Sequence, residues 1–466
     1  MWFLHHTLFV INVFVFFYFV FVNGSYLILI FISYLQVRNE KKTEDFFDLT
    51  GLFNTNLYRS ASILAPAYNE ELSIIESTRA LLNLEFSNYE VIVINDGSND
   101  NTLGKLIEHF EMKEIDRHVP RSIETKPVKK IYGSDKHPNL IVIDKENGRK
   151  ADALNAGINA SRKELIFAVD SDSLLERDVL KKMLMAFTLD EETIAVGGVV
   201  RVANGCTFRH GVVEQVNVPN SYIGRLQAVE YIRSFLFGRT SWDYLNSLLI
   251  ISGAFGVFDR EALIRVGGYL HDTVGEDVEL VVRLHRYHLE NNIPYRVRFL
   301  PFPVSWTEVP ENWKDLARQR NRWYRGLTDT LYRHRRMILR PEYGRIGMLA
   351  MPFFLFVELL SPVIEVGGYI FFTISYFLGV INWPFFLLFL IVCVVLGMFM
   401  SILSILLEEL TIRKYDRVRD VLILILFTFL ENLGYRQIHA WRRFRGLVDF
   451  LKGKKEWGKM TRKKTF

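Results

Sequence analysis

An acidic pair with one residue between its members, Asp170 and Asp172, follows the apolar run 165–169. Two carboxylates this close repel each other unless a cation lies between them. Hard divalent cations such as Mg²⁺ and Mn²⁺ take oxygen ligands of this kind and share them with a diphosphate. The pattern Asp-x-Asp is common by itself, but directly after an apolar strand it predicts a site for Mg²⁺ or Mn²⁺.

Two cations, Arg149 and Lys150, stand at the start of a predicted helix over 150–160, after the turn Asn147-Gly148. Backbone N–H groups and the helix dipole favour an anion at such a place. A diphosphate fits there. The alternative is a solvated basic surface that binds no ligand.

Polar turns follow two further apolar runs: Pro66-Ala67-Tyr68-Asn69-Glu70-Glu71 and Asn95-Asp96-Gly97-Ser98-Asn99-Asp100. Carboxylates and amides at two sheet ends suit the hydroxyl and amide-like partners that a ribose and a base present. Asn, Asp, Gly and Ser are also ordinary turn residues, so turn formation alone explains each motif equally well.

The segment 274–284 opens a predicted helix with the acids Glu276, Asp277 and Glu279 in its first turn. Acids there complement the positive end of the helix dipole, which is one explanation. The functional interpretation makes Asp277 a general base that removes the proton of an acceptor hydroxyl. The turn 252–256 then lines the acceptor site, or it is a packing turn.

The last candidate segment, 318–326, combines several arginines with Gln319, Trp323 and Tyr324. An indole offers a flat face to a sugar ring, and guanidinium groups offer donors to a leaving diphosphate. Interleaved arginine and aromatic residues also bind RNA by stacking, but this chain lacks the basic domain that would support that alternative. The sequence shows no Ser/His or Cys/His combination typical of an enzyme nucleophile.

These segments need a domain that brings them to one edge of a sheet. Short apolar runs alternate with amphipathic stretches such as 71–82 and 150–160; the runs are 62–65, 91–94, 140–143 and 165–169. Continuous apolar strands between helices predict a mostly parallel sheet covered on both faces. Ligands bind beyond the carboxyl ends of such strands, so an α/β domain over 45–335 would position the candidate residues.

Residues 1–36 predict an N-terminal transmembrane helix. From residue 8 to residue 35 the sequence is almost entirely Phe, Val, Ile, Leu and Tyr, and a bilayer span needs about 20 such residues. A cleaved signal peptide is the alternative, but it requires a basic start that this chain lacks. Arg38, Lys41 and Lys42 follow the helix, which predicts that the next domain is cytosolic.

Residues 346–440 predict a return to the membrane through two spans, 347–380 and 385–407. Glu358 and Glu365 fall in the first span, where they line a polymer channel or form a buried interhelical hydrogen bond. The apolar run 421–430 is about half a span, so we expect it to be interfacial or re-entrant.

The composition excludes several classes of protein. The two cysteines, Cys206 and Cys393, exclude a disulfide scaffold and a Cys-rich zinc module. From Arg436 to the end, eleven Lys and Arg stand against two acids, and we assign 441–466 to a basic tail on the cytosolic side. An anionic lipid surface is a better partner for this tail than nucleic acid.

Taken in order, these motifs resemble the processive branch of glycosyltransferase family two, which includes cellulose, hyaluronan and poly-N-acetylglucosamine synthases. The similarity covers about 58–330 through motifs, and the whole chain through its membrane, catalytic domain and membrane layout. The signatures are the Asp96 turn, Asp170-Ser171-Asp172, Gly275-Glu276-Asp277, and Gln319-Arg320-Asn321-Arg322-Trp323 in the family's Gln-x-x-Arg-Trp form. Asp152 is a departure, because a small residue is common at its position in some members.

The resemblance implies an α/β GT-A (Rossmann-like) fold combined with transmembrane and interfacial helices. It also implies an inverting transfer with a metal-bound nucleotide diphosphate as leaving group. By motif match, Lys150 contacts phosphate, Asp170 holds nucleotide and metal, Asp172 holds the metal, and Asp277 is the base. Gln319, Arg322 and Trp323 border the acceptor and steady the diphosphate. The nucleoside, usually uridine, is held by Tyr68, Asn69, Glu70 and Asp96.

We therefore predict a hexosyltransferase of a bacterial plasma membrane with its catalytic domain in the cytosol. It would transfer a sugar from a UDP-sugar, with UDP-N-acetylglucosamine as the expected donor, to a growing polysaccharide and export the product. Its further partners would be membrane lipids and an accessory export subunit. One alternative is the transfer of a single sugar to a glycolipid or other lipid-linked acceptor. Another is a non-catalytic export or scaffold protein that uses the motifs for packing only.

Overall fold

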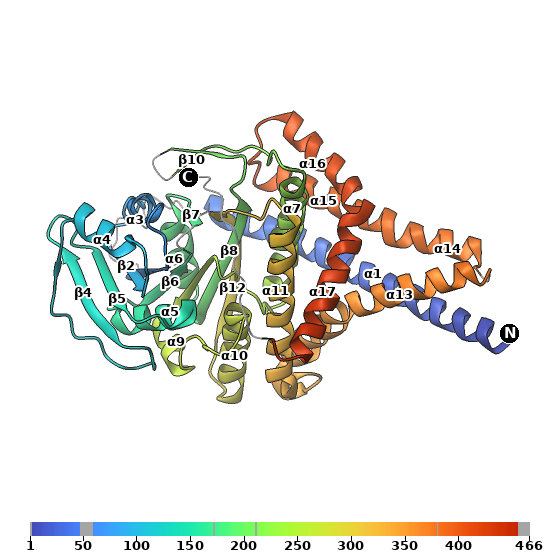
Figure 1. Cartoon of the computed structure of the whole chain (residues 1–466), viewed down its shortest axis with the longest axis horizontal. Helices are drawn as coiled ribbons and strands as arrows, with labels where there is room; N and C mark the ends of the chain where they lie inside the picture. Colours follow the sequence, from blue (N-terminus) through green and yellow to red (C-terminus); the bar gives the residue numbers. More distant parts are fainter. Residues whose placement is uncertain (1, 47–58, 171–172, 210–211, 380, 455–466) are drawn as a thin grey trace.

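The computed structural model describes residues 2–46, 59–170, 173–209, 212–379 and 381–454. It consists of an α/β body and an arm of long helices that carries the N-terminal end of the chain at its tip (Figure 1). The predicted metal ligand Asp172 and the last part of the predicted basic tail lie outside the described residues.

Parallel strands form the centre of the main sheet, in the order β5-β2-β1-β6. They are β1 (Ala61–Ala67), β2 (Tyr89–Asp96), β5 (Leu140–Lys145) and β6 (Leu165–Val169). Each predicted apolar run lies in one of these strands, so the predicted parallel sheet is confirmed for this part of the chain. Because the strands run in the same direction, the segments that follow them meet at one edge.

Further strands extend the sheet on both sides, which the apolar runs did not predict; all their pairings are antiparallel except that of β12 with β8. The added strands are β3 (Met112–Glu114), β4 (Val128–Ser134), β7 (Ser173–Leu175), β8 (Thr193–Val202), β11 (Phe255–Asp259) and β12 (Arg296–Thr307). β4 pairs with β5 on one side, and β11 lies antiparallel between β6 and β8 on the other. β7 follows the predicted metal ligands and pairs with β12 at the far edge. The sheet is therefore mixed.

Helices cover both faces of this sheet. Within β1, Leu64 and Ile63 belong to different hydrophobic clusters, as expected for neighbours that point to opposite faces. The cluster of Leu64 includes residues of α5 and α10, whereas the cluster of Ile63 includes residues of α3, α4 and α6. These helices are α3 (Ile74–Leu82), α4 (Thr102–His109), α5 (Arg149–Ala160), α6 (Val179–Leu189) and α10 (Glu276–Glu290).

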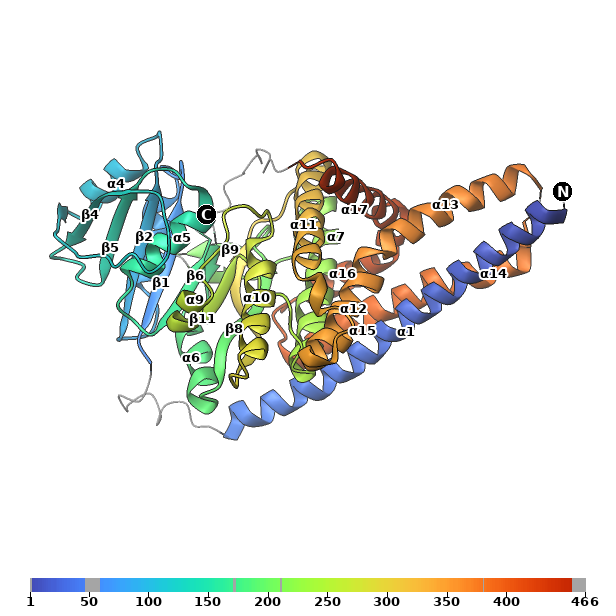
Figure 2. The same ribbon diagram turned by 90° about the horizontal axis from the view of Figure 1, so that it is seen from below.

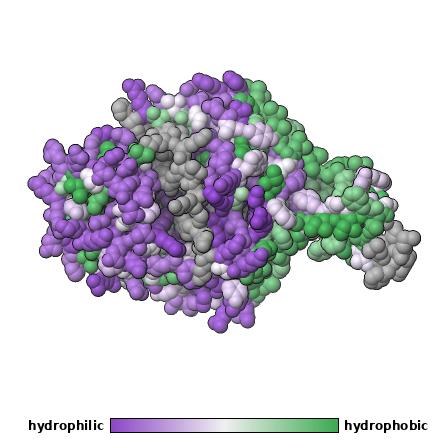
Figure 3. All heavy atoms as spheres, viewed as in Figure 1, coloured by the Kyte–Doolittle hydropathy of each residue, from purple (hydrophilic) through white to green (hydrophobic). Residues whose placement is uncertain are grey.

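Four helices among the described residues are long and apolar enough to cross a membrane: His6–Glu40, Ile346–Phe377, Phe386–Thr411 and Val418–Leu451. The first belongs to α1 (Trp2–Phe46), which continues past the predicted boundary at residue 36. Two views show α1 beside α13 (Ser361–Phe377) and α14 (Trp383–Leu390) in the arm (Figure 2). Hydrophobic residues gather on the arm and its base, whereas the α/β body is largely hydrophilic on the face shown (Figure 3).

The fourth of these helices is longer than the predicted half span at 421–430. It contains α16 (Val418–Leu430) and α17 (Arg436–Leu451), and its backbone leaves the helical conformation at Leu433 and Gly434. Gly434 has a φ of +99°, which glycine adopts without a Cβ clash. The chain therefore changes direction here, and the number of membrane crossings stays a prediction.

The predicted basic tail does not begin as a separate segment at residue 441. That position lies inside α17, which packs against α11 (Trp313–Arg333) of the α/β body. Asn321 of α11 donates a hydrogen bond to Asp449 of α17 at 2.8 Å. The described part of the tail is thus a packed helix, because one side of it is buried against α11.

Ion pairs, one of them buried, also hold the α/β body to the membrane helices. Arg298 of β12 contacts Glu40 of α1 at 2.7 Å. Arg201 of β8 pairs with Glu408 near the end of α15 (Leu396–Thr411), and both side chains are buried. Breaking a buried pair leaves a charge without a partner, so these contacts fix the position of the body relative to the helices.

Candidate active site

The carboxyl edge of the parallel strands opens into a cavity of about 2000 Å³. The segment after β1 contributes Tyr68, Asn69 and Glu70 to its lining, and β2 contributes Asp96. The other predicted site residues in the described part of the chain also line it: Lys150, Asp170, Asp277, Gln319, Arg322 and Trp323. Because the cavity is long, contacts decide which of these residues are neighbours.

Lys150 and Asp277 both contact the backbone of Gly253, and Asp170 contacts Lys150. Lys150 Nζ lies 2.5 Å from Asp170 Oδ1 and donates to the Gly253 carbonyl at 2.8 Å. The Gly253 N–H donates to Asp277 Oδ2 at 3.0 Å. A Cβ at position 253 would lie 3.2 Å from Asp277 Oδ2 and 3.4 Å from Lys150 Nζ, so glycine permits this close approach. The predicted metal, phosphate and base positions are therefore adjacent.

The antiparallel pairing of β11 with β6 explains this convergence. Phe255 of β11 pairs with Val169 of β6, which places the turn before β11 beside the end of β6. The Asp170 N–H donates to the Ala254 carbonyl at 3.3 Å. Residues 252–254 line the cavity, as the functional interpretation of this turn requires.

One lysine faces several carboxylates at this point. Burial lowers the pKa of Lys150, but Asp170, Glu276 and Asp277 outweigh burial, so the pKa lies above its ordinary value. Burial raises the pKa of Glu276, while Lys150 opposes this shift and Asp277 adds to it. The surplus of negative charge favours a cation in addition to Lys150.

The oxygen donors fit a hard divalent cation. Asp170, Glu276 and Asp277 all present carboxylates to the cavity, and Mg²⁺ and Mn²⁺ prefer such ligands. Within the described ranges, no three His, Cys, Asp or Glu side chains group closely enough to hold a metal ion. The second predicted ligand, Asp172, lies outside these ranges, so the metal site stays a prediction with Asp170 as its described member.

The turns after β1 and β2 are hydrogen-bonded to each other. The Asn69 N–H donates to Ser98 Oγ at 3.0 Å, and Asn69 Oδ1 accepts the Asn99 N–H at 2.8 Å. Asn69 has a φ of 57°, a left-handed conformation that Asn tolerates better than most residues. Tyr68 is 47% exposed at the cavity. The turns thus present an aromatic ring and amide groups, which suit a base and a ribose.

Asp96 is bonded to the start of α5. Its Oδ1 accepts the Gly148 N–H at 2.9 Å, and its Oδ2 accepts the Arg149 N–H at 2.8 Å. Arg149 has a φ of 73°, an uncommon conformation for a residue with a side chain. Asp96 therefore holds the turn that presents Lys150, in addition to the nucleoside role that remains predicted for it.

Lys145 and Asp152 support this turn, and the motifs did not reveal their role. The side chain of Lys145 has no exposed area, lies 2.9 Å from Asp96 Oδ1 and also pairs with Asp152. The departure at Asp152 thus has a physical reason, because this second carboxylate balances the buried lysine. A lysine at the end of the apolar run 140–143 was the available signal.

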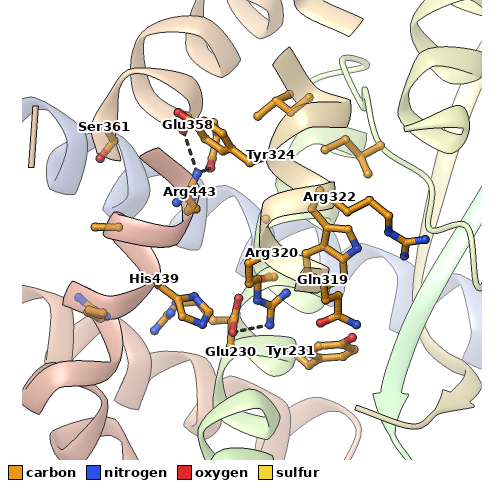
Figure 4. A pocket seen from close by; sticks show the side chains of 18 of the residues that line it. Glu230, Tyr231, Gln319, Arg320, Arg322, Tyr324, Glu358, Ser361, His439 and Arg443 are labelled. Carbon is orange, nitrogen blue, oxygen red and sulfur yellow. Dashed lines mark hydrogen bonds and ion pairs between the residues drawn. The ribbon is translucent and has the colours of Figure 1, made fainter. Parts of the chain in front are cut away.

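Helix α11 contains the remaining predicted site residues. Gln319, Arg322 and Trp323 are spaced three and four apart, so they share one side of the helix. Gln319 is 9% exposed and Trp323 is 43% exposed. Gln319, Arg320 and Arg322 appear together in the close view of the cavity (Figure 4).

Beyond α11 the cavity continues between the membrane helices. Polar residues in this part include Asn12, Asn23, Ser375 and Asn382. Glu358 also lines the cavity and accepts hydrogen bonds from Tyr26 at 2.5 Å and Arg443 at 3.1 Å. Glu358 therefore forms the predicted hydrogen bonds between helices (Figure 4), while its role in a polymer channel stays a prediction.

Comparison with known proteins identifies the family. The profile described as glycosyl transferase family 2 matches residues 62–267, and the profile of glycosyl transferase family group 2 matches residues 165–402. The second match covers half of the chain. It includes Asp170, Asp277 and the segment 318–326, together with membrane helices.

Curated relatives carry the name poly-beta-1,6-N-acetyl-D-glucosamine synthase. The protein of Staphylococcus aureus (strain COL) is 27% identical over 281 residues, which are 60% of this chain and 57% of that protein. The protein of Staphylococcus epidermidis (strain ATCC 35984) is 29% identical over 273 residues, which are 58% of this chain and 55% of that protein. The match thus spans little more than half the length of these relatives.

Among solved structures, the mannosyltransferase PcManGT from Pyrobaculum calidifontis, in complex with GDP-Man and Mn²⁺, has a similar fold. Its TM-score is 0.53 at 15% identity, and the superposition covers 95% of this chain and 100% of that chain. The predicted GT-A fold with membrane helices is confirmed. Because the second profile matches half of the chain, the chain belongs to glycosyl transferase family group 2 and is a glycosyltransferase, with four helices among its described residues that are long and apolar enough to cross a membrane.

Proposed function

We propose that this enzyme transfers N-acetylglucosamine from its UDP-sugar to a growing polysaccharide and moves the product across the membrane. One observation carries the proposal: a single cavity joins the residues predicted for the nucleotide, Trp323, and the membrane helices. A polymer that grows at Asp277 would have a continuous path to the arm. The name of the staphylococcal relatives supports the choice of sugar.

In this proposal the donor lies along the carboxyl edge of the sheet. Tyr68, Asn69, Glu70 and Asp96 hold the uridine, because their turns present an aromatic ring and polar groups. Lys150 contacts the diphosphate. Mg²⁺ or Mn²⁺ held by Asp170 and Asp172 would neutralise charge on the diphosphate.

Asp277 removes the proton from the acceptor hydroxyl. As the acceptor oxygen forms its bond to the anomeric carbon, the bond from that carbon to the diphosphate oxygen breaks, and UDP leaves with the electron pair. Attack from the face opposite the diphosphate inverts the anomeric configuration. Lys150 and Arg322 stabilise the charge that develops on the leaving group, and no enzyme nucleophile takes part.

Trp323 supports the acceptor sugar through its exposed indole face, and Gln319 borders the same position. The polar lining of the arm supports passage of a glycan, because hydroxyl groups require hydrogen-bond partners in a membrane. Arg38, Lys41 and Lys42, near the C-terminal end of α1, support a cytosolic catalytic domain.

A second candidate is the transfer of one sugar to a lipid-linked acceptor. The same membrane part of the cavity has apolar walls that include Phe19, Phe372, Phe386 and Phe389. An isoprenoid or acyl chain would bury its surface against them. The product distinguishes the two candidates.

The test uses the full chain, purified in detergent and returned to vesicles, with a panel of radiolabelled UDP-sugars and Mg²⁺ or Mn²⁺. We expect UDP-N-acetylglucosamine to give a product of high molecular weight that resists lipid extraction. Chelation with EDTA should abolish the reaction, and added Mn²⁺ should restore it. A single labelled sugar in the lipid extract would contradict processive synthesis and support the second candidate.

A further inference from the structure

Arg320 lies between Gln319 and Arg322, and none of the roles above falls to it. It lines the cavity but is only 4% exposed. Its Nη2 donates to Glu230 Oε2 at 2.8 Å, and its Cζ lies 4.2 Å from the centroid of the Trp323 ring. Among the described residues, its Nε and Nη1 have no hydrogen-bond partner. A buried charged donor without a partner costs free energy, so a ligand that supplies oxygen acceptors would bind here.

Several elements hold this guanidinium in place. Glu230 belongs to α7 (Tyr222–Tyr231), and its Oε2 also accepts the Tyr435 hydroxyl at 2.8 Å. Tyr435 lies at the start of α17, where its ring packs against His439 at 4.2 Å between centroids. The close view shows Glu230 beside Arg320, with His439 facing the same space (Figure 4). The donors of Arg320 are therefore preorganised.

Arg320 and Glu230 form a pair without net charge. Burial raises the pKa of Glu230, but Arg320, His439 and the Tyr435 hydroxyl outweigh burial, so the pKa lies below its ordinary value. Glu230 stays ionised at neutral pH and neutralises Arg320. A carboxylate ligand would meet Glu230 at close range, whereas hydroxyl or amide oxygens would meet no repulsion.

We propose that Arg320, held by Glu230 and Tyr435, forms a second subsite for an uncharged glycan, next to the sugar on Trp323. Nε and Nη1 donate to hydroxyl or acetamido carbonyl oxygens of the neighbouring sugar. Glu230 and Tyr435 are positioning residues for these donors. The inference rests on the proposed function and adds the position and charge class of the bound chain.

The experiment uses the full-length enzyme with UDP-N-acetylglucosamine and a tetrasaccharide of N-acetylglucosamine as acceptor. The variant Arg320→Lys keeps the charge but loses the planar fork of donors. We expect it to raise the acceptor KM about tenfold or more, as loss of hydrogen bonds to a charged donor predicts. The KM for UDP-N-acetylglucosamine and the slow hydrolysis of this donor by water should not change.

Two further variants separate positioning from folding. Tyr435→Phe removes the hydroxyl that bonds to Glu230. Glu230→Gln removes the negative charge that holds Arg320 and keeps nearly the same side-chain shape. Each of these two variants should raise the KM for the acceptor, and neither should change the KM for UDP-N-acetylglucosamine. If Arg320→Lys lowers the melting temperature strongly, Tyr435→Phe decides the outcome.

Arg333→Lys is the matched control on the same helix. Arg333 pairs with Asp329 and Asp272 at the end of α11 and is not part of the cavity lining. The variant Arg333→Lys should leave the KM values for the acceptor and for UDP-N-acetylglucosamine unchanged.

An unchanged acceptor KM in Arg320→Lys and Tyr435→Phe would overturn the proposal. Equal affinity for a hyaluronan tetrasaccharide, which carries carboxylates, would overturn its charge class. Failure of the proposed function gives a different result, because the wild-type enzyme would then leave UDP-N-acetylglucosamine untouched.

Discussion

At the scale of single residues, Asp277 is the general base of the proposed function. It lies in the first turn of α10, where its carboxylate accepts N–H groups from Gly253 and Val278 at 3.0 and 2.9 Å. These bonds fix the carboxylate toward Lys150 and Asp170. Acids in a first helical turn also complement the helix dipole, so the contact with Gly253, rather than the helix position, supports a catalytic role.

The variant Asp277→Asn tests that role. It keeps an oxygen that can accept the Gly253 N–H but removes the proton acceptor, so sugar transfer should fall by about 10²–10⁴. Binding of the UDP-sugar should persist. Measurement of initial transfer rates together with equilibrium binding of labelled UDP-sugar checks both parts.

Glu290→Gln at the exposed end of the same helix is the control and should keep ordinary activity. Ordinary transfer by Asp277→Asn would show that another group accepts the proton. Unchanged export by a protein that shows no transfer would instead support the scaffold alternative.

At the scale of elements, one buried lysine joins the ends of two strands to the start of a helix. Lys145 ends β5, opposite Asp96 of β2 in the parallel register. Its pairing with Asp96 and Asp152 compensates two carboxylates that are each 3% exposed. The turn before Lys150 therefore depends on the buried ion pairs of Lys145 with Asp96 and Asp152.

Replacement of this lysine should destabilise the fold. Lys145→Met leaves both carboxylates without their cation, so the free energy of unfolding should fall by about 3–5 kcal/mol. The double variant with Asp152→Asn should recover part of this loss, because it removes one of the two carboxylates that Lys145→Met leaves without a cation. Thermal and denaturant unfolding in detergent measures both.

Lys130→Met on the neighbouring β4 is the comparison, since Lys130 and Glu114 form an exposed pair. Its effect should stay below about 1 kcal/mol. An equally small effect for Lys145→Met would mean that the cluster relaxes without its lysine.

Helix α10 also contains a histidine that folds in its neutral form. Burial lowers the pKa of His285 to about 4, although a hydrogen bond to the Leu248 carbonyl opposes the shift. The Tyr295 hydroxyl is 2.9 Å from the other ring nitrogen. The neutral ring satisfies both contacts, because one nitrogen donates and the other accepts.

The pH dependence of stability follows from this shift. The unfolded chain binds a proton at His285 near pH 6.5, whereas the folded chain does so only near pH 4. The contribution is therefore complete above pH 6.5 and is lost as the pH falls toward 4. Between pH 7.5 and 5 it should fall by about 2 kcal/mol.

Unfolding curves across this range should show a flatter pH dependence for His285→Gln than for the wild type. The variant loses the titration but remains neutral. Parallel pH profiles of the two proteins would contradict a buried neutral histidine.

At the scale of the whole molecule, the cavity makes the α/β body and the arm one functional unit. Buried pairs such as Arg201 with Glu408 join the two parts, while the cavity runs from Asp170 to the membrane residues Ser375 and Cys393. In the proposed function, a polymer would leave along this path only if the arm stays aligned with the sheet edge.

Cys393 allows a direct test of the path. Its side chain lines the membrane part of the cavity, whereas Cys206 is 8% exposed and lies outside the lining. Reaction with a bulky maleimide should therefore block elongation while slow hydrolysis of the donor continues. Gel analysis of polymer length and assay of released UDP measure the two activities.

Cys393→Ser should be active and resistant to the reagent. Full elongation by the labelled wild-type protein would show that the glycan does not pass Cys393. Loss of donor hydrolysis together with elongation would instead place the damage in the fold.

Local patterns predicted the strands of the parallel sheet and the apolar helices well. The length and composition of run 91–94 are typical of a buried strand, and those of run 8–35 are typical of a membrane helix. The antiparallel strand β11 escaped prediction, because its pairing with β6 depends on residues about 90 positions apart in the sequence. The helical state of residue 441 also depended on a partner, since α17 packs against α11.

The sequence by itself determined which chemical groups the protein offers: the acid at 170, the cation at 150, the acid at 277 and the Gln319–Trp323 motif. Their order and types do not depend on folding. Only the tertiary structure decided that Gly253 brings three of them together, that Lys145 and Asp152 support Asp96, and that Arg320 faces the cavity. These relations join residues distant in the chain, and short-range propensity carries no information about such distances.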